Sequence, residues 1–174
     1  LEIESYGNRL LDEIRKVFEE IDIVVNNAGL LINKPFQSLS TEEVAKTINL
    51  NLLSPTLLIK MLLPFVKKGG HIVNISSMGG FQGSQKFPGL TVYSSAKAGL
   101  ASLTECLAEE YKESGISFNC LAIGATDTEM LREAFPGYQA PFMANDMAEF
   151  IADFALNKGR FFNGKIIPVS ISTP

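Results

Sequence analysis

Short apolar runs that are rich in β-branched residues alternate along this chain with longer segments whose apolar residues recur at helical spacing. The runs predicted as strands are 21–25, 71–75, 116–123 and 165–170. The segments predicted as helices are 1–20, 41–67, 92–114 and 146–156. Strands that alternate with helices favour a parallel sheet, so the sequence predicts an α/β fold with a doubly wound, Rossmann-like sheet.

Capping and turn residues set the expected ends of these segments. Ser40 followed by Glu43 has the spacing of a capping box, which predicts that a helix begins directly after Ser40. Pro55 is expected to bend that helix, and the glycine pair at 69–70 is expected to end it before the next strand. The stretch 124–145 contains prolines and glycines, and we expect a loop with a short helix there.

Composition and charge exclude several classes of protein. The 174 residues carry a net charge of −4 and their lysines and arginines are scattered, so no basic stripe for nucleic acid is present. The longest apolar stretch, 57–66, is interrupted by Lys60 and Pro64 and is too short to span a bilayer. The polar stretch 1–16 does not resemble a signal peptide. We therefore expect one domain over 1–174 that binds neither nucleic acid nor membrane.

Histidine and cysteine are too few for a metal site. His71 is the single histidine, and we interpret it as the polar start of a strand. Cys106 and Cys120 are separated and lie in apolar surroundings, which predicts buried free thiols rather than a disulfide. Because free thiols are typical of a reducing compartment, we expect a cytoplasmic protein. One histidine and two separated cysteines do not make a metal site, so we expect no bound metal.

Small and polar residues follow the predicted strands at the points where these strands end. They are the Asn-Asn-Ala-Gly turn at 26–29, the serine pair at 76–77 and the segment 124–128. In a doubly wound sheet, ligands bind beyond the carboxyl ends of the strands. We therefore expect these three segments to border one cleft.

Tyr93 and Lys97 lie four residues apart in a predicted helix, so both side chains share one face. A free tyrosine has a pKa near ~10 and is a poor base at neutral pH. A neighbouring ammonium stabilises the phenolate and lowers that pKa. The pair therefore predicts proton exchange in carbonyl reduction or alcohol oxidation, although a solvent-exposed helical pair has the same spacing.

Two further polar side chains are candidates for the same cleft. Ser77 follows a predicted strand, where its hydroxyl could hydrogen-bond a substrate oxygen; a turn-forming or helix-capping serine is the alternative. Asn51 lies inside a predicted helix, where asparagine is a mediocre helix former. Either its side chain faces solvent or its amide is used, and Asn49 is a nearby alternative.

Taken in order, these motifs resemble the short-chain dehydrogenase/reductase family. The turn at 26–29, the asparagine at 51, the serine pair at 76–77 and Tyr-x-x-x-Lys at 93–97 match the family in order and approximate spacing. The resemblance extends from the first helix to the last strand. It implies an oxidoreductase that transfers hydride between NADP or NAD and a small-molecule carbonyl or alcohol, in a homodimer or homotetramer.

The resemblance assigns a role to each candidate catalytic residue. Tyr93 would be the acid/base that exchanges a proton with the substrate oxygen. Lys97 would lower the pKa of Tyr93 and hydrogen-bond the nicotinamide ribose. Ser77 would polarise and orient the substrate carbonyl, and Asn51 would hold a water that links Lys97 to a proton relay.

The resemblance also selects between neighbouring residues. Asn51 is favoured over Asn49 by its distance from the helix-ending Pro64. Ser77 is favoured over Ser76 because the active serine of the family is usually the last of this pair. The cofactor-binding residues that the family implies are Asn26, Asn27, Ala28, Gly29, Tyr93, Lys97, Gly124, Thr126 and Thr128.

This sequence departs from the family pattern in three places. Ile123 is followed by Gly124 without the usual proline, and the loop between the serine pair and Tyr93 is longer, with 86–89 as the excess. The phosphate-binding motif Thr-Gly-x-x-x-Gly-x-Gly does not occur, because the glycines at 79–83 follow the wrong strand. We therefore expect the C-terminal, catalytic part of the domain, with the first strands absent and an exposed sheet edge.

Two other functions are compatible with these motifs. One is a non-catalytic, truncated dehydrogenase that acts as an oligomerising scaffold. The other is a nucleotide-sugar epimerase or dehydratase, which shares Tyr-x-x-x-Lys but continues into a larger C-terminal domain.

For the substrate, aromatic and apolar residues suggest a lid over a neutral or hydrophobic carbonyl compound, although they could simply pack the loop down. They are Phe135, Tyr138, Phe142 and Met143.

Overall fold

The computed structural model describes residues 2–171, and its centre is a four-stranded parallel sheet in the order β1-β2-β3-β6. This confirms the predicted α/β fold with a parallel sheet. The strands are β1 (Ile21–Asn26), β2 (Val66–Ser77), β3 (Ser117–Ile123) and β6 (Lys165–Val169). A two-stranded sheet beside it pairs β4 (Thr126–Asp127) with β5 (Phe142–Met143).

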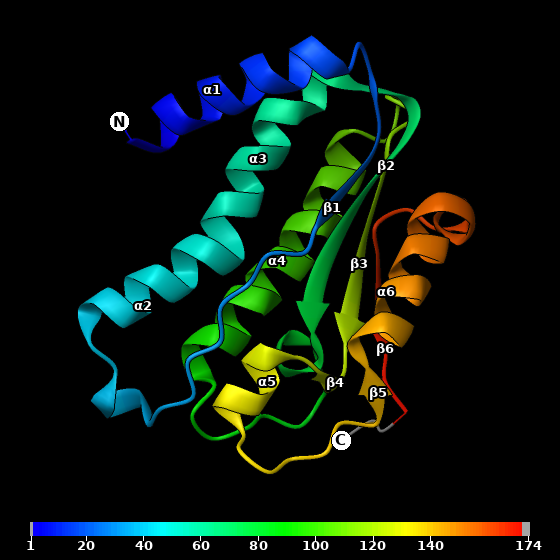
Figure 1. Ribbon diagram of the computed structural model, residues 1–174. Coiled ribbons are helices and arrows are strands. Elements are labelled where there is room, and N and C mark those ends of the chain that lie inside the picture. Colours follow the sequence, from blue (N-terminus) through cyan, green and yellow to red (C-terminus); the bar gives the residue numbers. More distant parts are fainter. Residues whose placement is uncertain (1, 172–174) are drawn as a thin grey trace.

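Helices cover both faces of the sheet, as Figure 1 shows. The longer helices are α1 (Glu2–Val17), α2 (Thr41–Ile48), α3 (Ser54–Leu62), α4 (Thr91–Glu110) and α6 (Ala144–Asp153). A short helix, α5 (Glu129–Ala134), follows β4. Helices α1, α3 and α4 lie on one side of the sheet and α6 lies on the other.

The two faces of the sheet form two separate cores. Ile72 and Phe118 point to the side of α3 and α4, where they pack with Ile59. Val73 and Leu121, from the same two strands, point to the opposite side, towards α6 and the turn that follows it. This alternation is the two-residue period of a strand, and burial on both faces is why the strands read as continuous apolar runs.

The predicted helix over 41–67 is a continuous but irregular helical stretch that ends at Phe65. Ser40 and Glu43 form the expected capping box: Ser40 Oγ accepts from the Glu43 N–H at 3.1 Å, and Glu43 Oε2 accepts from the Ser40 N–H at 2.9 Å. A π-helical turn, Asn49–Leu53, lies directly before Pro55. Because proline has no N–H to donate, the wider turn is located where the regular pattern is interrupted.

The same stretch, Thr41–Phe65, is long and apolar enough to cross a membrane by length and composition, with a mean hydropathy of 1.4. This differs from the expectation that no segment meets that test. A mostly buried core helix of a water-soluble protein passes it as well, whereas 17% of this window is buried here. Here Ile59 and Leu62 pack against the sheet, so contact with the core explains this part of the apolar character.

Three local expectations are wrong. The glycine pair at 69–70 lies inside β2 and does not end the preceding helix; Gly69 has φ 86°, and the pairing of β1 with β2 is irregular there. Helix α4 ends at Glu110, before the predicted end at 114. Cys106 is exposed rather than buried, because it lies on the outer face of α4, whereas Cys120 in β3 is buried as expected.

His71 is not the polar start of a strand but a buried residue that hydrogen-bonds Asn119 of β3 and the main chain after α6. It lies within β2 and is 6% exposed. Its Nδ1 is 3.1 Å from the Ala155 carbonyl, and its Nε2 is 3.0 Å from Asn119 Nδ2. A neutral imidazole with the proton on Nδ1 satisfies both contacts, since Nδ1 donates and Nε2 accepts. Burial lowers the pKa of His71 below its ordinary value.

We predict that acidification destabilises the protein through His71. Because the folded-state pKa is lowered, the unfolded chain takes up the proton first, so the free energy of unfolding falls as the pH drops below about 6.5. Denaturant unfolding at about pH 7.5 and about pH 5.5 measures this loss. In His71→Gln, which is less stable throughout, the loss between the two values should be smaller. An equal loss in both proteins would contradict the assignment.

Asn51 fixes the loop that follows β1. It is fully buried, whereas its neighbour Asn49 is exposed. Its Nδ2 donates to the carbonyls of Leu30 at 2.7 Å and Thr47 at 2.9 Å, and its Oδ1 accepts from the Leu30 N–H at 3.2 Å. Both amide hydrogens therefore donate to main-chain carbonyls. The side chain holds the loop because it bonds both the N–H and the carbonyl of Leu30.

We predict that Asn51→Ala lowers the free energy of unfolding by about 2 kcal/mol, because it leaves main-chain groups of Leu30 and Thr47 without their partner. The matched control is Asn49→Ala, which removes an exposed amide and should change stability by less than about 0.5 kcal/mol. Equal effects of the two substitutions in denaturant unfolding would contradict this role of Asn51.

Candidate active site

A cleft of about 520 Å³ opens beyond the carboxyl ends of the parallel strands. Asn27 lies in it directly after β1, Ser77 at the end of β2 and Gly124 directly after β3. Tyr93 and Lys97 enter it from α4. The expectation that the ends of the strands border one cleft is met, and this is the position at which α/β sheets bind ligands.

Lys97 is a buried cation on the floor of the cleft, 4% exposed. Its Nζ donates to the Ile75 carbonyl of β2 at 2.8 Å. Desolvation lowers the pKa of Lys97 to about 8, so the amine is still mainly protonated at neutral pH. A Cβ atom on Gly29 would lie 3.1 Å from Asn51 Oδ1, a tight contact, and 3.4 Å from this Nζ, so the glycine gives Asn51 room beside the ammonium.

Tyr93 of α4 and Ser77 of β2 line the same cleft, although they belong to distant segments of the chain. Burial raises the pKa of Tyr93, and the nearby Ser77 hydroxyl lowers it by a smaller amount. This differs from the expectation that Lys97 lowers the pKa of Tyr93. The ammonium lies 5.9 Å from the ring centroid, and desolvation of the phenol is the larger effect. Tyr93 is therefore a neutral phenol, a proton donor, at neutral pH.

The short turn after β2 sets the position of Ser77. Ser77 Oγ accepts from the Gly79 N–H at 3.1 Å. A Cβ atom on Gly80 would lie 2.7 Å from the carbonyl carbon of Lys97, so only glycine lets this turn pack against α4. These glycines follow the strand that ends in the serine pair and do not match the phosphate-binding motif. Their signal was the position directly after the serine pair, facing the Tyr-x-x-x-Lys helix.

Ser76 and Ser77 have different surroundings. Ser76 is buried and donates to the Lys97 carbonyl at 2.8 Å, so it holds the main chain of α4. Cys120 lies beneath it, and burial raises the pKa of this thiol to about 11, so it stays protonated. Of the two serines, Ser77 is the one whose hydroxyl influences the pKa of Tyr93, which agrees with the choice made from the sequence.

The turn at 26–29 divides into a structural and a cleft-lining part. Asn26 is buried, and its Nδ2 donates to Asn74 Oδ1 at 2.7 Å, whose own Nδ2 donates to Thr104 Oγ1 at 2.9 Å. Asn26 therefore connects β1 to β2, and through Asn74 to α4. Asn27 and Gly29 line the cleft. Asn26 and Ala28 are not among the residues that line it.

The residues after β3 lie where the sequence analysis expected them. Gly124, Thr126 and Thr128 all line the cleft. Thr128 also caps α5, because its Oγ1 accepts from the Leu131 N–H at 3.2 Å. A Cβ atom on Gly124 would lie 2.6 Å from Ser170 Oγ, so the turn after β3 has no room for a side chain there.

The apolar lid is only partly where it was expected. Phe135 and Tyr138 line the cleft, but Phe142 and Met143 are not among its lining residues, since they pair with β4 as β5. Apolar residues on two other segments also line the cleft and are not predicted from the sequence. Those on α5 could have been found from Thr128, because a helix-capping residue there predicts a short helix whose one face can line the cleft. The missed residues include Leu31, Met130 and Leu131.

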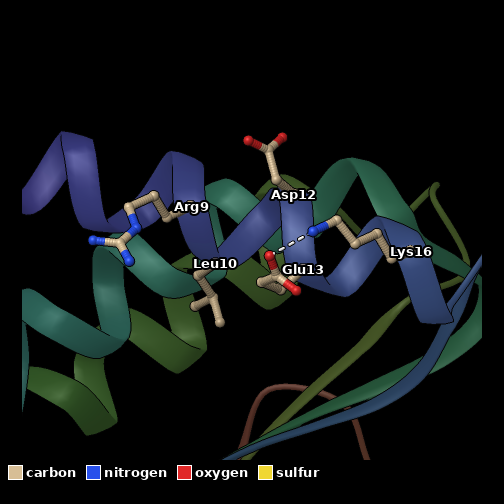
Figure 2. Close-up of a pocket in the computed structure, with 5 residues that line it drawn as sticks. All are labelled: Arg9, Leu10, Asp12, Glu13 and Lys16. Atoms are coloured by element: carbon tan, nitrogen blue, oxygen red, sulfur yellow. Dashed lines mark hydrogen bonds and ion pairs between the residues drawn. The ribbon is translucent and has the colours of Figure 1, made fainter.

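A second hollow, of about 770 Å³, lies along α1 and carries no comparable chemistry (Figure 2). All of its lining residues come from this one helix, and Glu13 and Lys16 form an exposed ion pair of 2.6 Å. Exposed pairs of this kind contribute little to stability or binding. The cleft at the ends of the strands is therefore the candidate site.

Comparison with known proteins identifies relatives over most of the chain. The family model described as short chain dehydrogenase matches residues 3–139. The 3-oxoacyl-[acyl-carrier-protein] reductase FabG of Chlamydia trachomatis is 38% identical over 117 residues, which are 66% of this chain and 46% of that protein. The FabG of Haemophilus influenzae is 31% identical over 173 residues, 92% of this chain and 70% of that protein. This chain thus spans about half the length of the first of these relatives.

Solved structures with the same fold agree with this result. A short-chain dehydrogenase of Burkholderia cenocepacia in complex with NADP has a TM-score of 0.81 at 25% identity, over 94% of this chain and 70% of that one. One from Escherichia coli CFT073, complexed with NADPH, has a TM-score of 0.84 at 24% identity, over 94% and 69% of the two chains. Together with the family model over residues 3–139, these matches show that the chain belongs to the short-chain dehydrogenase family.

Proposed function

We propose that this chain carries the catalytic part of an NAD(P)-dependent oxidoreductase that interconverts a carbonyl and an alcohol. The observation that supports this most directly is that Ser77, Tyr93 and the buried Lys97 line one cleft at the carboxyl end of β2. These groups can supply a proton, orient an oxygen and stabilise a negative charge, which are the needs of carbonyl reduction. The 3-oxoacyl reductases among the relatives support the same class of reaction.

The lining of the cleft fits the nicotinamide end of a dinucleotide. Gly29 and Gly124 contribute main chain without a side chain to this lining. The hydroxyls of Thr126 and Thr128 and the Lys97 ammonium offer hydrogen-bond donors around it. We propose that these residues, with Asn27, hold NADP or NAD, as a structural relative in complex with NADP also suggests. A bound nicotinamide supplies the hydride.

The chain's own groups would manage the proton. Ser77 Oγ, held by the Gly79 N–H, orients the substrate oxygen next to Tyr93. Tyr93 Oη would give its proton to that oxygen while the carbonyl carbon accepts a hydride, so that the carbonyl becomes an alcohol. The Lys97 ammonium stabilises the phenolate that Tyr93 becomes. Tyr93 starts out as a protonated phenol, as reduction requires.

Asn51 contributes by position in this proposal. Its amide hydrogens are both used by main-chain carbonyls, so they are not available for the relay water that the family resemblance implies. Its Oδ1 would lie 3.1 Å from a Cβ on Gly29, next to the Lys97 ammonium. Asn51 would thus shape the wall beside Lys97.

We further propose a homodimer or homotetramer in the cytoplasm. The assembly is implied by the family, through the helical stretch 41–65 and α4. The compartment is supported by the free thiols of Cys106 and Cys120, which are typical of reducing conditions.

We predict that Tyr93→Phe in the full-length protein lowers kcat for carbonyl reduction by at least about 1,000-fold, because it removes the proton donor. NADPH and NADH are supplied in turn with a panel of ketones, aldehydes and acyl thioesters, and the loss of nicotinamide absorbance is measured. Affinity for the dinucleotide, measured by fluorescence titration, should change less than about threefold. Normal turnover by Tyr93→Phe would show that another group is the acid. A full-length protein that binds neither dinucleotide would favour the non-catalytic scaffold.

A further inference from the structure

The half of the cleft beyond Ser77 and Tyr93 is walled by apolar side chains on two sides. One wall comes from the loop after β2 and the other from α5 and the loop that follows it. Lys97, on the floor, is the one charged residue among those that line the cleft within the described residues 2–171. The apolar residues of these two walls are Met78, Phe87, Leu90, Leu131 and Phe135, and Leu31 from the loop after β1 also lines the cleft.

The cation nearest to the first wall is already used by the protein. Lys86 adjoins Phe87 in the loop after β2, and its ammonium donates to three oxygens of that loop. The distances are 3.0 Å to the Gly79 carbonyl, 2.7 Å to the Phe81 carbonyl and 3.0 Å to Ser84 Oγ. Lys86 therefore stabilises the loop that carries Phe87 and does not line the cleft.

The charges on the second wall are also paired with each other. Arg132 of α5 forms an ion pair of 2.6 Å with Asp127, and neither residue lines the cleft. Leu131, the neighbour of Arg132, does line it. The apolar side chain of Leu131 on α5 thus lines the cleft, whereas the guanidinium of Arg132 pairs with Asp127 outside the lining.

We infer that the substrate is a neutral carbonyl compound with an apolar carbon body, which lies between the Phe87 loop and α5. This inference rests on the proposed function and names its substrate class. The one cation that lines the cleft is the Lys97 ammonium beside Tyr93, and Lys86 and Arg132 are engaged elsewhere. A carboxylate at the end of the substrate remote from the reacting carbonyl would therefore lose its hydration without gaining a cation. Burial of an uncompensated charge is costly, whereas apolar carbon gains free energy by contact with such walls.

A matched pair of substrates tests the inference on the full-length protein. Octan-2-one and the 7-oxooctanoate anion have the same carbon skeleton and the same position of the ketone relative to its methyl end, but only the second carries a charge. We expect kcat/KM to be at least about 100-fold higher for octan-2-one. Equal values, or a preference for the anion, would overturn the inference while leaving the proposed oxidoreductase intact. Turnover of no carbonyl compound with either dinucleotide would overturn the proposed function itself.

A new cation in the cleft should reverse part of this preference. In Leu131→Arg a guanidinium faces the cleft, and the ratio of kcat/KM for the anion to that for the ketone should rise about tenfold. Tyr138→Arg makes the same change at a more exposed lining position, and so remains informative if the first variant folds poorly. The control is Met143→Arg, an exposed residue outside the cleft lining, which should leave the ratio unchanged. A ratio that moves equally in all three, or in none, would contradict the inference.

Discussion

The hydrogen bond from the buried Lys97 ammonium to the Ile75 carbonyl is the contact on which the rest of the site depends. It joins α4 to the end of β2 at the base of the cleft. No ion pair found among residues 2–171 includes Lys97, so the charge is balanced only by a main-chain dipole. A buried cation in this state favours any negative charge that develops nearby. The phenolate of Tyr93, one helical turn away, is the group placed to carry such a charge.

Two buried hydrogen-bonded links keep α4 and the sheet in register around this contact. Ser76 Oγ holds the carbonyl of Lys97 itself, and Asn74 Nδ2 holds Thr104 Oγ1 one to two turns further along α4. Asn26 extends the second link to β1. The geometry of the cleft therefore rests on buried polar groups whose hydrogen bonds are satisfied inside the protein.

Much of this arrangement could be predicted from the sequence, because it follows from periodicity and from strand ends. The β-branched runs placed β1 and β3, and the capping box at Ser40 placed the start of α2. The positions of Tyr93, Lys97 and Ser77 followed from the spacing of the family motif. Their meeting in one cleft is a consequence of parallel strands that end at the same edge of the sheet.

What could not be predicted depends on contacts between distant segments. Gly69 resembled a helix end but lies in β2, because the pairing with β1 extends back to Val66. The pKa of Tyr93 is raised rather than lowered, because desolvation depends on burial that a four-residue spacing does not reveal. Cys106 resembled a buried thiol because its sequence neighbours are apolar, but the outward face of α4 decides its exposure.

The pH dependence of carbonyl reduction by the full-length protein tests the role of the Lys97 ammonium most directly. The pKa of Lys97 is about 8, so kcat/KM should fall as the pH rises through that value, when the amine loses the charge that stabilises the Tyr93 phenolate. A profile that stays flat to about pH 9.5 would contradict the account, because reduction would then proceed equally well beside a neutral amine.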